Sequence, residues 1–200
     1  MPLTSYGKNE AAKGASAKMT WLGLTESAAY TPTSNTAIGS SVLNLTGAKS
    51  KGFTNGATVV VRKLTASITG LLVEKRLLYV VGEATNTFEL AYEEGGAGIK
   101  VAGHELETAS TEFALLIEIS GGSYKRIKTT WGTAAGGEIS DTAAEAFKVP
   151  AGKEITDAIW WEGESTGKAF ANAKLEAAEK FGSEGEYKVT SDKLEANAVA

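Results

Sequence analysis

The stretch that decides the fold is residues 116–176, LIEISGGSYKRIKTTWGTAAGGEISDTAAEAFKVPAGKEITDAIWWEGESTGKAFANAKLE. Glycine pairs and one Pro-Ala-Gly turn divide it into four short runs in which apolar and polar side chains alternate. Within residues 124–131, Ile127, Thr129 and Trp131 share one face, and Lys125 and Lys128 can reach water. Alternation with a period of two is typical of a strand that buries one face only. The stretch therefore predicts antiparallel β-structure.

The flanking residues add one helix and more strands. Residues 5–18 are rich in alanine, with lysine and glutamate, which favours a short N-terminal helix. Residues 19–26 predict a strand, and a Thr/Ser/Pro/Asn linker starts near Thr31. Toward the C-terminus, alternation at 187–191 after the turn at 182–185 predicts a closing hairpin with the strand before it.

Short strands at near-regular spacing follow the linker. Glycine turns separate them, among them Asn55-Gly56 and Gly95-Gly96, which tolerate positive φ. Such spacing is typical of a small barrel or sandwich. The predicted strands are residues 41–46, 58–63, 77–81, 87–92 and 99–101.

Composition excludes several kinds of chemistry. The 200 residues are 42% hydrophobic, enough for a sizeable core, and contain no cysteine, so disulfides, thiolate metal sites and cysteine nucleophiles are excluded. A net charge of −4 argues against nucleic acid or an anionic membrane as a partner, because both are bound through a positive stripe. The N-terminus lacks the apolar region of a signal peptide, and no apolar run approaches the roughly 18 residues of a membrane helix.

Catalytic signatures are weak. His104 is the single histidine and sits in a predicted surface turn without a nucleophile motif beside it. Two carboxylate pairs have the residue types that a glycosidase uses, but solvated turns are the better explanation of both. These pairs are Glu93 with Glu94 and Glu162 with Glu164. We therefore expect no catalytic residue, no cofactor and no metal site.

Aromatic residues are the candidates for an interface. Adjacent residues of a strand point to opposite faces, so one of Trp160 and Trp161 is expected in the core and the other toward solvent or a partner. A covering loop or helix would account equally well for the second indole. Tyr6 and Trp21, near the N-terminus, complete the set of candidate interface residues.

The order of motifs in the opening stretch resembles a family of small structural proteins of tailed bacteriophages, often labelled tail-fibre-like. The family pattern runs E-x-SGG-x-Y-x-R, an aromatic-ended strand, an AAGG turn, a strand ending in PAG, a strand with isoleucine and tryptophan, and a TGG-like turn. The matching residues are Glu118–Gly122, Tyr124, Arg126, Trp131, Ala134–Gly137, Phe147, Val149–Gly152, Ile155, Trp160 or Trp161, Thr166-Gly167, and, at the N-terminus, Tyr6–Asn9 and Trp21–Leu24.

A second piece resembles a small β-module of phage tail and fibre proteins. It carries LNLTG, GFTNGATVVV, LYVVGEATNTFELA and GGAGI in order, between residues 43 and 99. In the first family only a short loop separates the early strand from the SGG-x-Y motif, so this resemblance implies that the module is inserted there. The expected architecture is mainly β: an antiparallel β-sandwich with a short N-terminal helix, formed by residues 1–30 and 110–200, and an inserted small β-barrel or sandwich domain, residues 31–109.

The resemblance implies a non-enzymatic structural protein of the virion, assembled in the bacterial host cytoplasm. Within the particle we expect a capsid decoration protein, with a minor tail protein or a tail-fibre or receptor-binding component as the alternative. The expected partners are the major capsid protein or tail proteins of the same virion, and further copies of the chain as a trimer or lattice. Two other classes stay open: an adhesin that uses aromatics such as Tyr79 or Tyr92, and a glycosidase that uses the carboxylate pairs.

Overall fold

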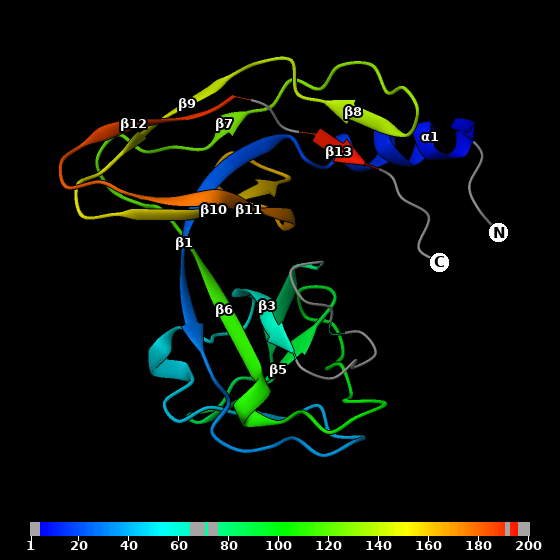
Figure 1. Cartoon of the computed structure of the whole chain (residues 1–200), viewed down its shortest axis with the longest axis vertical. Helices are drawn as coiled ribbons and strands as arrows, with labels where there is room; N and C mark the ends of the chain where they lie inside the picture. The colour runs from blue at the N-terminus through cyan, green and yellow to red at the C-terminus, as the bar shows by residue number, and fades with distance from the viewer. Residues whose placement is uncertain (1–4, 65–70, 72–75, 191–192, 196–200) are drawn as a thin grey trace. The chain divides into compact units, whose positions relative to one another are not determined.

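The computed structural model describes residues 5–64, 71, 76–190 and 193–195. The protein is mainly β, with antiparallel strand pairing throughout the described residues and one short α-helix at the N-terminus, as the sequence predicts (Figure 1). The chain divides into two compact units. Unit 1 is residues 1–25 with 118–200, and unit 2 is residues 26–117.

Two strands carry the chain between the units, and their bounds explain where the boundaries fall. Strand β1, Trp21–Tyr30, leaves unit 1 and β6, Thr111–Glu118, returns to it. Unit 2 therefore begins at Glu26 rather than at residue 31 and ends at Ile117 rather than at residue 109. The Thr/Ser-rich segments mark the ends of these strands, whereas the boundaries between the two units fall within the strands themselves.

Unit 1 is a β-sandwich. One sheet has the order β11-β10-β1, with β7 also paired to β1, and a second sheet pairs β12 with β9. Both sheets contribute to one apolar cluster, which includes Leu22 of β1, Phe147 of β9 and Trp160 of β10. The strand bounds are β7 Ile127–Lys128, β9 Glu145–Val149, β10 Glu154–Trp161, β11 Ala169–Lys180 and β12 Gly185–Val189.

The N-terminal helix α1, Ser5–Ser16, is held at one point of unit 1. Its buried Ala12 packs with Ala134 and Ile139. Gly137, in the Ala-Ala-Gly-Gly turn, donates its N–H to the Asn9 side-chain oxygen at 2.6 Å. Small residues on both sides let the helix approach the turn closely. The neighbouring pair of strands is β8, Glu138–Ser140, with β13, Lys193–Glu195.

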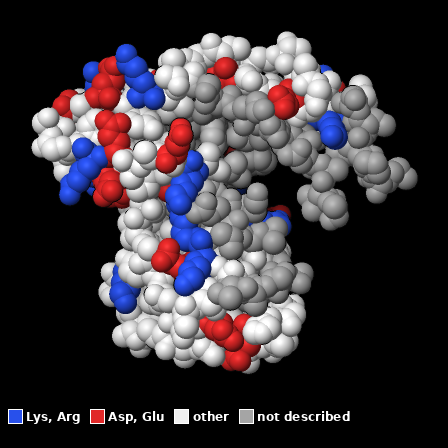
Figure 2. Space-filling view, in the orientation of Figure 1, with Lys and Arg blue, Asp and Glu red and all other residues white. Residues whose placement is uncertain are grey.

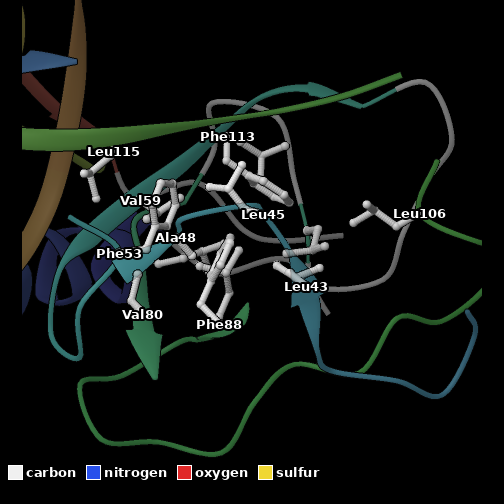
Figure 3. Close-up of a cluster of buried hydrophobic side chains, with 14 of the residues drawn as sticks. Leu43, Leu45, Ala48, Phe53, Val59, Val80, Phe88, Leu106, Phe113 and Leu115 are labelled. Carbon is white, nitrogen blue, oxygen red and sulfur yellow. The ribbon is translucent and has the colours of Figure 1, made fainter. Parts of the chain in front are cut away.

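Unit 2 is built around a cluster of three phenylalanines and surrounding aliphatic residues (Figure 3). Phe88 lies with its ring centroid 4.5 Å from that of Phe53 and 6.0 Å from that of Phe113, and the second pair is edge-to-face. The strand order is β6-β3-β4-β5-β2. The remaining bounds are β2 Leu43–Asn44, β3 Thr58–Leu64, β4 Leu78–Val81, β5 Thr87–Ala91, and short 3-10 helices at Lys49–Lys51 and Thr108–Ser110.

Three local expectations need correction. The last two strands of the sandwich do not form a hairpin with each other, because β11 pairs with β10 and β12 pairs with β9. The strand expected over 124–131 is reduced to the two residues of β7, and that expected over 99–101 is absent. The alternation of apolar and polar side chains indicates which face of a strand is buried, but not which strand lies beside it.

Candidate functional site

The Glu-x-Ser-Gly-Gly-x-Tyr-x-Arg segment, residues 118–126, supplies three side chains to a polar cluster in unit 1. We call this cluster the Arg126 clamp; it consists of Glu118, Tyr124 and Arg126 from the segment, together with Gly23 and Trp161. Arg126 is only 8% exposed and holds Glu118 through two parallel hydrogen bonds, Nε to Oε1 and Nη2 to Oε2, both 2.7 Å. Two parallel bonds of this kind fix the geometry of both side chains as well as their charge.

The same guanidinium makes three further contacts, one of them a 3.4 Å hydrogen bond from Nη1 to the Thr166 carbonyl. Its Nη1 donates to the carbonyl oxygen of Gly163 at 2.8 Å, and its carbon lies 3.7 Å from the centroid of the Trp161 ring. Gly163 belongs to the loop that follows β10. Arg126 thus ties the loop before β7 to the loop after β10.

Two glycines bring the chain back to this position. Gly121 and Gly122 have φ angles of 97° and 55°, which side chains other than glycine seldom adopt. The turn is closed by a 3.2 Å hydrogen bond from the N–H of Tyr124 to the carbonyl of Gly121. The Ser-Gly-Gly part of the motif therefore has a conformational role: its turn positions the Tyr and Arg side chains that follow.

Tyr124 occupies the edge of β1 where its pairing with β7 has ended. Its hydroxyl accepts the N–H of Leu24 at 2.7 Å and donates to the Leu24 carbonyl at 3.3 Å. Strand β7 pairs only with Trp21 and Leu22. The phenol therefore satisfies the Leu24 N–H and shares the Leu24 carbonyl with the Ile119 N–H, and burial raises the pKa of its hydroxyl above the usual value.

Gly23 gives the clamp its room. A Cβ at this position would lie 3.1 Å from Glu118 Oε1 and from the Tyr124 hydroxyl, and 3.2 Å from Trp161 Nε1. A side chain at this position would therefore have to displace, by a few tenths of an ångström, three side-chain ends that reach over the strand.

The interface candidates fall in different environments. Trp160 is 6% exposed and packs in the core of unit 1, whereas Trp161 is partly buried with the Arg126 guanidinium over its ring. The expectation that one indole lies in the core is confirmed by Trp160, and Arg126 covers one face of the other. Trp21 is partly buried. Tyr6, on α1, is 74% exposed and is the candidate with the most open surface.

The candidate catalytic residues are not brought together into a site. His104 and all four glutamates of the two pairs are exposed. Glu162 forms an ion pair with Lys18 at 3.5 Å. Among the described residues, no group of three or more histidines, aspartates and glutamates has an arrangement that could hold a metal ion.

Sequence reasoning missed buried polar groups. Asp157, in the middle of β10, is fully buried; its carboxylate accepts the Thr156 hydroxyl at 2.8 Å, and its carbonyl accepts that of Thr25 at 3.4 Å. The sequence identifies Arg126 only as a motif position, because alternation places it on the strand face opposite to that of the apolar Ile127. The available signal for Asp157 was one charged residue inside an apolar strand.

Unit 2 contains a shallow pocket of about 420 Å³ between three turns. Its lining residues are Asn55, Gly56, Val81, Gly82, Glu94, Gly95 and Gly96. Glycines expose backbone groups to the pocket, and Glu94 is its one charged lining residue. Outside the pocket, Tyr92 is 39% exposed with the Arg76 guanidinium carbon 3.8 Å from its ring centroid, whereas Tyr79 is only 7% exposed.

Comparison with known proteins gives no relative for this chain: no family model matches it, nor does a curated protein or a solved structure. Within the described residues there is no helix of the length and apolarity needed to cross a membrane.

Proposed function

We propose that the protein is a non-enzymatic structural component of a tailed-bacteriophage virion, most fittingly a capsid decoration protein that binds the major capsid protein. The observation that carries the proposal is the Arg126 clamp. Glu118, Tyr124 and Arg126, which carry the resemblance to the phage family, are engaged with one another, with backbone groups and with Trp161. The motif fixes a fold, as expected of a protein that acts by contact.

A contact function needs exposed apolar groups, and both units have them. A few large apolar side chains exposed on a small protein are common, so their position carries more weight than their number. In unit 1, Tyr6 extends from the helix and Phe170, 45% exposed, lies on β11; in unit 2, Ile38 is 62% exposed. Virion symmetry would repeat each contact, in trimers or in lattice copies, so that a weak single contact becomes strong.

The direct test is the copy number in purified particles of the phage that encodes the chain, measured by quantitative mass spectrometry and located by immunogold labelling. Capsid decoration predicts on the order of hundreds of copies on the head. About three to twelve copies on the tail would replace this proposal by the tail-protein alternative. Absence from particles would contradict both.

Two exposed tyrosines provide a matched pair of variants. We expect Tyr6→Ser to lower the number of copies per particle, because it removes the most exposed aromatic of unit 1. Tyr92→Ser removes an exposed ring from unit 2, 39% exposed against 74% for Tyr6, and should leave the copy number unchanged. Equal retention of both variants would exclude Tyr6 from the contact.

The receptor-binding alternative gains support from the pocket in unit 2 and from Tyr92 near its Arg76 partner. Tyr79 is too deeply buried to contribute. Binding of the intact chain to a glycan array, lost on Tyr92→Ser or Glu94→Gln, would favour this alternative. Binding that both substitutions leave unchanged would remove the pocket from consideration.

A further inference from the structure

Two turns of unit 2 are joined by a reciprocal pair of hydrogen bonds between Asn55 and Glu83. The backbone N–H of Asn55 donates to Glu83 Oε2 at 2.5 Å, and the backbone N–H of Glu83 donates to Asn55 Oδ1 at 3.2 Å. The second carboxylate oxygen of Glu83 receives Lys49 Nζ at 3.0 Å. The Asn55 N–H, and secondarily Lys49, lower the pKa of the Glu83 carboxyl, which keeps it ionised as an acceptor.

Asn55 is followed by Gly56, and this order has a known chemistry. The backbone nitrogen of Gly56, after losing its proton to solvent base, can attack Cγ of Asn55. A new N–C bond forms, the side-chain nitrogen leaves as ammonia with a proton from solvent, and a five-membered succinimide remains. Water then opens the ring at either carbonyl, giving aspartate or isoaspartate. Glycine permits the attack because it has no side chain to obstruct it.

The folded structure opposes each part of that reaction. The Gly56 N–H is engaged with the carbonyl of Val80 at 2.9 Å, so the attacking nitrogen would have to give up a hydrogen bond before losing its proton. Val80 is fully buried and belongs to the phenylalanine cluster of unit 2, which holds this carbonyl in place (Figure 3). The Asn55 side-chain oxygen accepts the Glu83 N–H, so rotation of Cγ toward Gly56 breaks this bond of the reciprocal pair. The Glu83 carboxylate holds the turn through the other bond, to the Asn55 backbone N–H.

We propose that Asn55 is a latent deamidation site that Glu83 holds closed while unit 2 is folded. Asn55 is exposed, so water and base reach it as soon as the two turns separate. An aspartate product keeps an acceptor for the Glu83 N–H but adds a negative charge beside this acidic residue, and isoaspartate would lengthen the backbone inside the turn. Each opening that proceeds to reaction therefore leaves a permanent chemical record. This inference is independent of the proposed virion function.

The experiment incubates the full chain at mildly alkaline pH and follows residue 55 by peptide mapping that separates asparagine, aspartate and isoaspartate. We compare the wild type with Glu83→Ala and Glu83→Gln, and with Glu105→Ala, an exposed glutamate of the same unit, as the matched control. Loss of one charge-assisted hydrogen bond predicts about a tenfold faster reaction in Glu83→Ala. Glu83→Gln should be intermediate, because its amide oxygen still accepts, and the control should match the wild type.

A second measurement keeps the test decisive if Glu83→Ala does not fold. The wild-type chain in urea loses both turns, so its residue 55 should react much faster than in the folded protein. The proposal is overturned if folded and urea-unfolded wild type deamidate at the same rate. It is equally overturned if a folded Glu83→Ala variant, checked by circular dichroism, reacts no faster than the wild type.

Discussion

The two units fasten their strands with different chemistry. Unit 1 has an apolar core, but the loops that cross its sheet are held by Arg126, Glu118 and Tyr124, whose contacts are ionic or through hydrogen bonds. In unit 2 the strands are held by three phenylalanines, with Phe88 against both Phe53 and Phe113, and the contacts of Glu83 with Asn55 join two surface turns. A long loop has backbone groups that need polar partners, whereas short strands around a small core are held mainly by the close packing of apolar side chains.

The surface of unit 1 also carries ion pairs, and these are exposed, unlike the buried guanidinium in the Arg126 clamp. Acidic and basic groups alternate over the β9 and β12 end of the unit (Figure 2). Lys148 and Lys188 both pair with the Glu186 carboxylate, at 3.0 and 3.3 Å. These side chains are well exposed, so each pair contributes little to stability, in contrast to the buried guanidinium of Arg126.

Aromatic residues also make the units separately observable. All four tryptophans, Trp21, Trp131, Trp160 and Trp161, belong to unit 1, so tryptophan fluorescence reports on that unit alone. Amide hydrogen exchange in β3 and β5 reports on unit 2. The unfolding of each unit can therefore be followed separately in one sample.

Removing unit 2 has the largest effect. The chain leaves unit 1 after Thr25 and returns at Glu118, and the Ile119 N–H donates to the Leu24 carbonyl at 2.9 Å, so these ends are adjacent. We expect a variant in which a short Gly-Ser link replaces residues 26–117 to unfold in one cooperative step with a native-like tryptophan spectrum. An unfolded product by circular dichroism would show that unit 1 depends on its insertion.

Truncating Phe88 should destabilise unit 2 specifically. The side chain is 1% exposed and contacts both other phenylalanines of its cluster. Phe88→Ala should lower the free energy of unfolding of unit 2 by about 4 kcal/mol. Hydrogen exchange in β3 and β5 should accelerate, while the tryptophan transition of unit 1 stays in place; the exposed Phe170→Ala serves as control. A matching shift of the tryptophan transition would mean that the units unfold together.

Removing Arg126 should act on unit 1. Arg126→Ala leaves Glu118 without its partner and uncovers Trp161, so we expect a loss of about 3 kcal/mol in the urea transition followed by tryptophan fluorescence. Replacing Glu118 and Arg126 together by leucine and methionine should recover part of that loss, since no charge is left unpaired. The control is Lys128→Ala, an exposed cation two residues away. Equal stability of Arg126→Ala and its control would show that the Arg126 clamp does not stabilise unit 1.

The smallest effect is expected at Tyr124, and it depends on pH. Tyr124→Phe removes the partner of the Leu24 N–H and should cost about 1 to 2 kcal/mol at neutral pH. Because burial raises the pKa of this phenol in the folded state, its contribution is complete below the unfolded value of about 10 and is lost as the pH rises above it. Urea midpoints between neutral and alkaline pH should therefore fall more steeply in the wild type than in Tyr124→Phe. Parallel profiles would refute the assignment.

Much of the secondary structure could be read from the residues. The alanine-rich start gives α1, the Asn-Gly pair gives a turn with Gly56 at a φ of 86°, and alternation in 145–149 gives β9 with Phe147 and Val149 inward. The clamp could not be read in this way. Arg126 and Glu118 have the composition of a solvated strand end, and only their return over Gly23 turns them into buried partners.

Local sequence is enough to tell which strand faces are apolar, where glycine permits a turn, and that this chain has no cysteine, because these are properties of single residues and their neighbours. Tertiary structure alone decided that β11 joins β10 and β12 joins β9, that Arg126 is buried, and that Glu83 meets Asn55 across two turns. These contacts join residues far apart in the chain, and a local pattern carries no information about which distant group will complete it.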